Sequence, residues 1–185
     1  MEIDTEILIG KYAFISGATG GIGKAISVAL AEQGCNLFLT SSTDSGLQEV
    51  VELCEKYNIE VEAHSGDLSQ KDDIYKIIKH AKERFGKIDI LINSAGVFPN
   101  INLFEIDDEL YSEVLNVNFR SAFLFIREFS KDMVDQQWGR IVNIGSSSAY
   151  SGFGGTSMYC ASKHALLGFS RAIHDELKQY NVRSY

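Results

Sequence analysis

Tyr159 and Lys163, in the run Tyr-Cys-Ala-Ser-Lys, are the pair whose types and spacing best fit acid–base chemistry. On a helix, positions i and i+4 lie one turn apart on the same face, so the phenol and the ammonium can act together. A free tyrosine has a pKa of about 10 and is a poor proton donor at neutral pH. A neighbouring positive charge lowers that pKa, because it stabilises the phenolate. The pair predicts a tyrosine that gives or takes a proton, although the same spacing also occurs in helices that do no chemistry.

A glycine-rich turn near the other end of the chain could hold phosphate. Residues 11–16 form an apolar run typical of a buried strand, Gly-Ala-Thr-Gly-Gly-Ile-Gly follows at 17–23, and a helical pattern covers 24–33. Glycines let the backbone turn sharply towards a pyrophosphate, and free N–H groups at a helix N-terminus face the anion. The spacing is Gly-x-x-x-Gly-x-Gly rather than the commoner Gly-x-Gly-x-x-Gly. The strand before it and the helix after it favour a dinucleotide-binding turn over a plain turn.

Strands and helices alternate along the chain and must position these two motifs. Further strands are predicted at 35–40, 59–64, 87–93 and 140–144, and helices at 47–57, 69–85, 107–135 and 157–180. Ser69-Gln-Lys-Asp72 reads as a capping box, and Gly34 and Gly86 as helix stops. Repeated β–α units predict an α/β fold: a Rossmann-type, doubly wound parallel sheet flanked by helices, in a single domain over residues 1–185.

Composition excludes several classes of protein. The 185 residues are 45% apolar, enough for one core and too few for two full domains. No apolar run approaches the roughly 18 residues of a membrane span, and the acidic start of the chain lacks the basic residues of a signal peptide. The net charge of −8 disfavours nucleic acid and anionic membrane as partners. The three cysteines lack metal-ligand spacing and read as free thiols, so we expect a soluble cytoplasmic protein without a metal site.

Six motifs occur together in a fixed order. They are Ser16-Gly-Ala-Thr-Gly-Gly-Ile-Gly23, Asp67-Leu68, Asn93-Ser-Ala-Gly96, Asn118, Ser146 and Tyr159-x-x-x-Lys163. With them the chain resembles the short-chain dehydrogenase/reductase family from residue 11 to the end. The resemblance implies an NAD(P)(H)-dependent oxidoreductase that reduces a ketone to an alcohol or runs the reverse reaction. It also implies four catalytic residues: Asn118, Ser146, Tyr159 and Lys163.

The position in the chain selects the catalytic serine from three adjacent serines. The family serine follows the fifth strand, 13 residues before the tyrosine, which favours Ser146 over Ser147 and Ser148. Its hydroxyl is expected to donate to the substrate carbonyl oxygen.

Of the two asparagines in Asn-Val-Asn, the resemblance favours Asn118 over Asn116, because the following Phe-Arg-Ser-Ala-Phe matches the family pattern. Asn118 is expected to hold a water that connects Lys163 to solvent. The four histidines form no credible catalytic arrangement and read as surface or packing residues.

The resemblance also implies the residues that bind the cofactor. These are Gly17, Thr19, Gly20, Gly21, Ile22, Gly23, Ser41, Ser42, Asp67, Leu68, Asn93, Ala95, Gly96, Tyr159 and Lys163. Asp67 would accept a hydrogen bond from the adenine amino group, the alternative being a helix-entry residue. Asn93 and Gly96 would line the ribose region, the alternative being a purely structural turn.

The end of the second predicted strand bears on cofactor preference. NAD-preferring enzymes usually place an acid there for the ribose 2′-hydroxyl, whereas here the stretch is Thr-Ser-Ser-Thr at 40–43. Hydroxyls can donate to a 2′-phosphate, so we favour NADP(H) over NAD(H). The usual basic partner is absent, however: Gly20 occupies its place, and Lys24 is the one nearby cation, which either reaches the phosphate or is solvated.

Substrate and assembly depend on the resemblance alone. The pattern most resembles 3-oxoacyl-carrier-protein reductases, so the small-molecule carbonyl or alcohol substrate would be linked to acyl carrier protein; a sugar, a steroid-like compound or a small alcohol is the alternative. Residues 98–104 and 150–156 are expected to rim the pocket, with Phe153 an apolar contact. A homo-oligomer, dimer or tetramer, is expected. The candidates for its interface, or alternatively for the core, are Phe123, Phe125, Phe129 and Trp138.

Two further interpretations stay open. The chain could be a non-catalytic dinucleotide-binding sensor, but retention of the whole Asn-Ser-Tyr-Lys set favours an enzyme. Residues 181–185 resemble the beginning of a sixth strand, after which family members continue with further strands. We therefore expect the C-terminal strands to be missing. The second open interpretation is accordingly that the chain is an inactive fragment, in which the absent strands would leave a sheet edge exposed.

Overall fold

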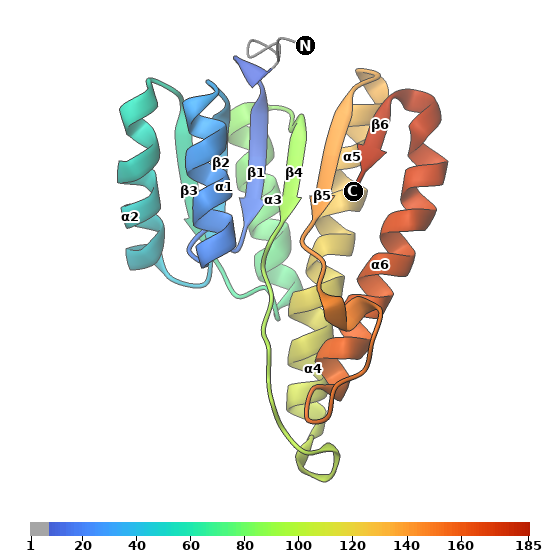
Figure 1. Ribbon diagram of the computed structural model, residues 1–185. Coiled ribbons are helices and arrows are strands. Elements are labelled where there is room, and N and C mark those ends of the chain that lie inside the picture. Colours follow the sequence, from blue (N-terminus) through green and yellow to red (C-terminus); the bar gives the residue numbers. More distant parts are fainter. Residues whose placement is uncertain (1–7) are drawn as a thin grey trace.

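Six parallel strands form one twisted sheet in the computed structural model, which describes residues 8–185 and so leaves the acidic N-terminal stretch outside the described residues. The strands are β1 (Tyr12–Ser16), β2 (Asn36–Ser41), β3 (Val61–Ser65), β4 (Ile90–Asn93), β5 (Gly139–Asn143) and β6 (Val182–Ser184). Their order is β3-β2-β1-β4-β5-β6 (Figure 1). The order reverses between β1 and β4, the point at which open α/β sheets bind ligands beyond their strand ends.

Helices cover both faces of the sheet. They are α1 (Gly21–Glu32), α2 (Asp44–Cys54), α3 (Lys71–Phe85), α4 (Asp108–Leu115), α5 (Ser121–Asp135) and α6 (Ser157–Leu177). A π-helical segment, Asn116–Arg120, joins α4 to α5. In Figure 1, α1 and α2 stand in front of β1 to β3, α3 and α5 lie behind the sheet, and α4 lies below the lower ends of the strands. The predicted Rossmann-type architecture is confirmed.

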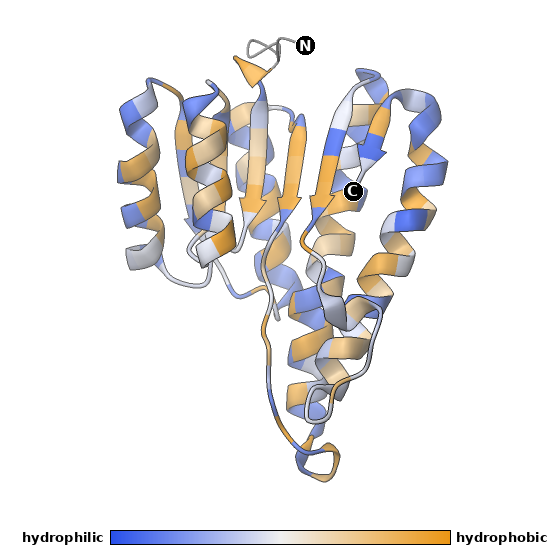
Figure 2. Cartoon of the chain, in the orientation of Figure 1, coloured by the Kyte–Doolittle hydropathy of each residue, from blue (hydrophilic) through white to orange (hydrophobic). Residues whose placement is uncertain are grey.

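The central strands β1, β2 and β4 are buried and largely apolar (Figure 2), whereas the edge strand β3 is only half-buried. Phe14 of β1 stacks on Phe38 of β2 with ring centroids 5.4 Å apart, and it also contacts Phe125 and Phe129 of α5. Phe125 and Phe129 are fully buried, so the core alternative holds for both and their assignment to an interface is wrong. They face inward because α5 directs this stripe of side chains onto the sheet.

A buried carboxylate ties the strands together at the end remote from the strand C-termini. Asp89 precedes β4, accepts a hydrogen bond from Tyr12 N at 3.0 Å and is fully buried. Lys87 Nζ lies 3.4 Å and Lys11 Nζ 4.0 Å from its Oδ1 atom. Because charge without a partner is costly in an apolar interior, this cluster fixes how β1 meets β4.

The element boundaries follow the predicted pattern with local differences. Gly34 and Gly86, at φ of +76° and +72°, end α1 and α3 as expected, since glycine adopts this backbone conformation without strain. The predicted strand at 59–64 runs from 61 to 65, and the helix predicted at 47–57 runs from 44 to 54 with a 3₁₀ turn after it. The start of a sixth strand is confirmed, since β6 pairs in parallel with β5.

The predicted capping box is wrong. The cap residue of α3 is Gln70, and its side chain makes no capping hydrogen bond. The N–H of Ser69 is instead taken by the Asp67 carboxylate at 2.8 Å, because an aspartate readily bonds the backbone two residues on. The three cysteines are buried and unpaired. Between residues 8 and 185, no helix has both the length and the apolar character that crossing a bilayer requires.

Candidate functional site

The glycine-rich turn packs so closely that side chains would not fit at two of its positions. Gly17 has a φ of +68°, and a Cβ atom there would lie 2.7 Å from the backbone of Ala95, in the turn after β4. A Cβ atom on Gly23 would collide with the Gly17 carbonyl oxygen. These glycines therefore bring the first turn of α1 against the ends of both β1 and β4.

The same turn exposes bare backbone at the start of a helix. A Cβ atom on Gly21 would meet nothing within 4 Å. The helix α1 begins there with Gly20 as its cap residue, and no side chain caps its first N–H groups. Uncapped N–H groups at a helix N-terminus, reached over bare glycine backbone, fit the pyrophosphate of a dinucleotide.

The cavity beside this turn has a volume of about 360 Å³, within the range of cofactor sites. Nine residues predicted to bind cofactor line it: Gly17, Thr19, Gly20, Ser41, Ser42, Asp67, Leu68, Ala95 and Gly96. The sequence interpretation missed five others: Gly66, Ser94, Val97, Glu113 and Val117. Six predicted residues are not among its walls: Gly21, Ile22, Gly23, Asn93, Tyr159 and Lys163. The cavity therefore gathers the ends of β1, β2, β3 and β4 with the wall formed by α4 and the π-helical segment.

Hydroxyl groups and one engaged lysine stand at the β2 side of the cavity. Thr19 Oγ1 and Ser41 Oγ are 2.5 Å apart, so the glycine-rich turn and the end of β2 share a hydrogen bond. Lys24 Nζ lies 2.5 Å from Glu49 Oε1 of α2. Lys24 is therefore paired with α2, and the hydroxyls, not a cation, line this end of the cavity.

Tyr159 and Lys163 lie one turn apart on α6, as their spacing predicts. Lys163 Nζ is 5.7 Å from the centre of the Tyr159 ring, and Phe98 packs edge-on against that ring at 4.6 Å. Lys163 is only 6% exposed and donates a hydrogen bond to the Ile144 carbonyl at 2.7 Å. Burial lowers the pKa of the Lys163 ammonium, because the charged form loses its hydration.

Asn118 is buried within the π-helical segment and bonded at both ends of its amide. Its Oδ1 accepts from Val97 N at 2.7 Å, and its Nδ2 donates to Val97 O at 2.9 Å and to Ser162 Oγ at 3.1 Å. Ser162 in turn donates to the Tyr159 carbonyl at 2.8 Å. The amide therefore connects the turn after β4 to α6, and both Nδ2 hydrogens are used within the chain. Its expected role in holding a water stays a prediction.

Ser146 follows β5 and caps a short 3₁₀ turn at 147–149. Its Oγ accepts a hydrogen bond from Ser148 N at 3.1 Å, which leaves the hydroxyl hydrogen to donate elsewhere. Ser146 and Lys163 together line a hollow of about 70 Å³, which Tyr150 also borders. Ser148, the neighbour passed over for the catalytic role, is buried. Ser162 was not identified from the sequence, where its i+3 position after Tyr159 was the available signal.

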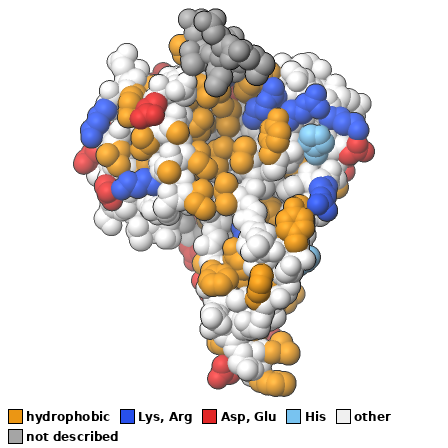
Figure 3. Space-filling view, in the orientation of Figure 1, with side chains coloured by type: hydrophobic (Ala, Val, Ile, Leu, Met, Phe, Trp, Pro, Cys, Tyr) orange, Lys and Arg blue, Asp and Glu red, His pale blue; other side chains and the backbone are white. Residues whose placement is uncertain are grey.

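The predicted rim is apolar and open. The segment between β4 and α4 projects below the sheet, and apolar side chains mark this part of the surface in Figure 3. Phe104 is 94% exposed near its tip, and Phe98 and Phe153 are also exposed. None of the four histidines lines either hollow: His64 and His80 stack on each other, His164 bonds Cys160 O and His174 bonds Ser184 O.

Comparison with known proteins gives a family and several relatives. Residues 11–185 match the family model of the short chain dehydrogenases. The uncharacterized oxidoreductase YgcW of Escherichia coli is 37% identical over 183 residues, covering 98% of this chain and 69% of YgcW. The L-rhamnose 1-dehydrogenase (NADP(+)) of Thermoplasma acidophilum is 37% identical over 178 residues, 94% of this chain and 69% of that protein. A 3-oxoacyl-[acyl-carrier-protein] reductase of Rickettsia conorii is 33% identical over 171 residues, 92% of this chain and 68% of the reductase.

Solved structures agree with these relatives. A metagenomic short-chain oxidoreductase in complex with NADP superposes with a TM-score of 0.91 at 30% identity, covering 95% of this chain and 80% of that one. An NAD⁺-bound xylitol dehydrogenase superposes with a TM-score of 0.89 at 27% identity, covering 96% and 69%. The glycine-rich turn with its open cavity, the family match and these likenesses lead to one conclusion. The chain belongs to the short-chain dehydrogenase/reductase family and is an NAD(P)-dependent oxidoreductase.

Proposed function

We propose that the chain reduces a ketone to an alcohol, or runs the reverse reaction, with Tyr159 as the proton donor. One observation carries this proposal: a chain of hydrogen bonds joins all three elements that bear the predicted catalytic residues. Asn118 bonds Ser162, and Ser162 bonds the backbone of Tyr159. Lys163 bonds the Ile144 carbonyl, two residues before Ser146.

Each of the four side chains has a separate task. When bound, the nicotinamide cofactor supplies the hydride for the carbonyl carbon. Tyr159 gives its phenolic proton to the carbonyl oxygen, and the Lys163 ammonium stabilises the resulting phenolate. Ser146 donates its hydroxyl hydrogen to the same oxygen. This hydrogen is free to donate, because the Ser146 hydroxyl acts as the acceptor in its bond with Ser148 N. Asn118 fixes the turn after β4 against α6.

We further propose that NADP(H) is preferred over NAD(H). The hydroxyls of Thr19, Ser41 and Ser42 at the β2 side of the cavity support this preference, because they can donate to a 2′-phosphate and none repels it. Lys24 contributes little here, since Glu49 already holds it. The NADP⁺-dependent L-rhamnose dehydrogenase supports the same choice, while the NAD⁺-bound xylitol dehydrogenase supports the opposite one. Asp67 is assigned to the adenine amino group in either case.

For the substrate, we propose a 3-oxoacyl group carried by acyl carrier protein. The likeness to the Rickettsia reductase and the exposed Phe98 and Phe153 support an acyl chain, while the likeness to the L-rhamnose dehydrogenase supports the sugar alternative. We also propose a homo-oligomer working in the cytoplasm, and a single domain over the whole chain.

The first experiment is a fluorescence titration of the protein with NADPH and NADH in parallel. Tighter binding of NADPH supports the proposed preference, and tighter binding of NADH contradicts it. Binding of neither cofactor contradicts the proposed function.

Turnover tests the catalytic assignment. Tyr159→Phe should lower turnover of a 3-oxoacyl thioester by roughly 10² to 10⁴ while leaving cofactor affinity intact, because only the proton donor is removed. Tyr111→Phe, on the exposed side of α4, is the matched control and should retain full turnover. Turnover that survives in Tyr159→Phe would contradict the assignment, and cofactor binding without turnover of any ketone or alcohol would favour the sensor.

A further inference from the structure

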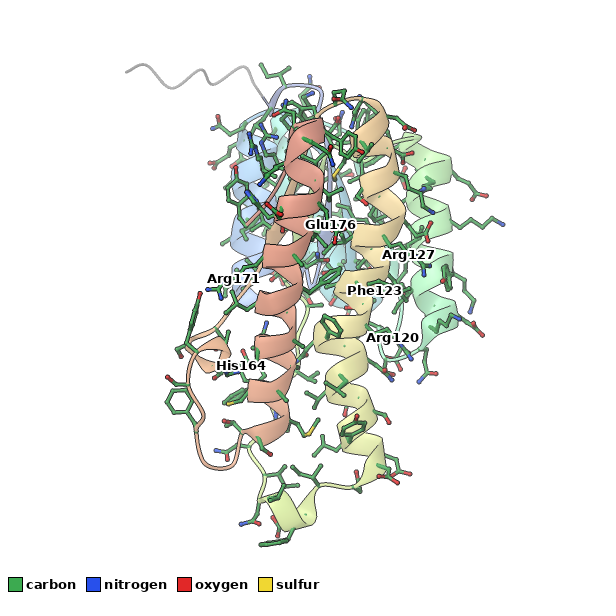
Figure 4. The ribbon with its side chains drawn as sticks, turned by 90° about the vertical axis from the view of Figure 1, so that its right-hand side faces the viewer. Arg120, Phe123, Arg127, His164, Arg171 and Glu176 are labelled. Carbon is green, nitrogen blue, oxygen red and sulfur yellow. The ribbon has the colours of Figure 1, made fainter. Side chains whose placement is uncertain are left out.

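Arg120 links two segments that line the cofactor cavity from different elements. It is the last residue of the π-helical segment, and its Nη2 atom donates a hydrogen bond to the carbonyl of Ser69 at 2.7 Å. Ser69 belongs to the turn between β3 and α3, which is 51 positions away in the sequence. Figure 4 shows Arg120 and Arg127 on the side of α5 that faces α3.

The turn that Arg120 holds is the one that carries Asp67. Ser69 N donates to Asp67 Oδ1 at 2.8 Å, and Asp67 N donates to Asp73 Oδ2 at 3.3 Å. The Ser69 residue is therefore held at both of its backbone groups, its N–H by Asp67 and its carbonyl by Arg120. With Oδ1 engaged, the Asp67 carboxylate keeps its other oxygen for a donor in the cavity.

The π-helical segment, which bears Arg120, forms part of the wall of the same cavity. Val117, in the π-helical segment with Arg120, lines the cavity together with Asp67 and Leu68. The Nε atom of Arg120 is buried and has no hydrogen-bond partner among the described residues. The guanidinium therefore makes its one hydrogen bond within the described residues through Nη2, to the Ser69 carbonyl. Arg127 offers the contrast: its guanidinium reaches Tyr75 and Glu128 on an exposed surface.

We propose that Arg120 is a positioning residue for the adenine end of the cofactor. By holding the Ser69 carbonyl, it fixes the turn in which the Ser69 N–H orients the Asp67 carboxylate, and it keeps that turn in place opposite Val117 across the cavity. Arg120 itself does not touch the cofactor or the reacting atoms. The inference rests on the proposed adenine role of Asp67.

The test compares the two halves of the cofactor as separate probes. Binding of 5′-AMP and of nicotinamide mononucleotide to the full chain is measured by ligand-observed NMR for the parent protein, Arg120→Met and Arg120→Lys. Arg120→Met should weaken 5′-AMP binding about tenfold, the scale of a lost hydrogen bond from a charged donor, and leave the mononucleotide affinity unchanged. Arg120→Lys keeps a cationic donor and should restore most of the 5′-AMP affinity.

Arg127→Met is the matched control, since it removes a nearby arginine that bonds Tyr75 of α3 without touching Ser69. It should change neither affinity. Equal 5′-AMP affinity in Arg120→Met and Arg127→Met overturns the inference, and so does a parallel loss of both probes in Arg120→Met, which is the mark of a general structural role. If Arg120→Met melts below the assay temperature, Arg120→Gln is judged by the same outcomes. A parent protein that binds dinucleotide but not 5′-AMP overturns the inference alone, whereas one that binds no dinucleotide refutes the proposed function as well.

Discussion

Replacing Asn118 by alanine should destabilise the fold far more than the same change at Asn116, its neighbour in the π-helical segment. The Asn118 side chain is 2% exposed and makes three hydrogen bonds, two to the backbone of Val97 and one to Ser162. Asn116 is half-buried and makes no side-chain hydrogen bond among the described residues. The two variants therefore remove the same type of side chain at positions two residues apart, one with hydrogen-bond partners and one without.

The size of the effect follows from these contacts. Each intramolecular hydrogen bond contributes a net ~0.5–1.5 kcal/mol, and orphaned buried partners cost more. Three bonds give a loss of about 2–4 kcal/mol in the free energy of unfolding. For a chain of this length, 1 kcal/mol corresponds to about 2–4 °C in melting temperature, so Asn118→Ala should melt about 5–15 °C lower.

Circular dichroism thermal scans and urea titrations of Asn118→Ala, Asn116→Ala and the parent protein measure this difference. Asn116→Ala should stay close to the parent, since surface and half-buried changes without lost partners usually fall within about 0.5 kcal/mol. Equal melting temperatures for the two variants would refute the reasoning. They would mean that the amide of Asn118 is exchanged for water at no cost.

Three further changes test other contacts. Asp89→Ala should lower the free energy of unfolding by about 3 kcal/mol in urea titrations, because it strips a fully buried carboxylate from its cationic partners; a loss below 1 kcal/mol would contradict the buried cluster. Burial lowers the pKa of Lys163 in the folded chain below its ordinary 10.5. At a pH between the folded pKa and 10.5, the unfolded chain therefore holds a proton on Lys163 that the folded chain lacks. The free energy of unfolding should rise with pH in that window. Lys163→Met should lack this rise when both proteins are unfolded in urea at pH 7 to 10.5, and an identical pH profile would contradict it. Burial raises the pKa of Cys35 to about 12 and that of Cys54 to about 11, whereas hydrogen bonding, above all with the Thr156 hydroxyl, lowers the pKa of Cys160. Iodoacetamide at pH 8 should therefore alkylate Cys160 first in peptide mass spectra, and earlier labelling of Cys35 would reverse the expected order.

The architecture was readable from the sequence because its signals are local. Buried parallel strands are continuous apolar runs, and helices between them carry a 3.6-residue period, so the order of elements and the glycine-rich turn could be predicted together. The pair Tyr159 and Lys163 required only the pitch of a helix. Element ends were harder to predict, because competing local hydrogen bonds affect them: the Ser69 N–H, expected in a capping box, bonds the Asp67 carboxylate, and α3 begins at Lys71.

The sequence by itself determined the fold class, the family motifs and the residue types that the chemistry needs, since each depends on spacing within one element or one turn. Tertiary structure decided which of these groups meet. Only folding brings the Asn118 amide to Val97 and Ser162, which lie 21 and 44 positions away, and turns Phe125 into the core rather than towards a partner. Only folding pairs Lys24 with Glu49 and leaves hydroxyls at the cavity wall. The physical reason is that hydrogen bonds and burial act over a few ångströms in space, and sequence distance does not measure that separation.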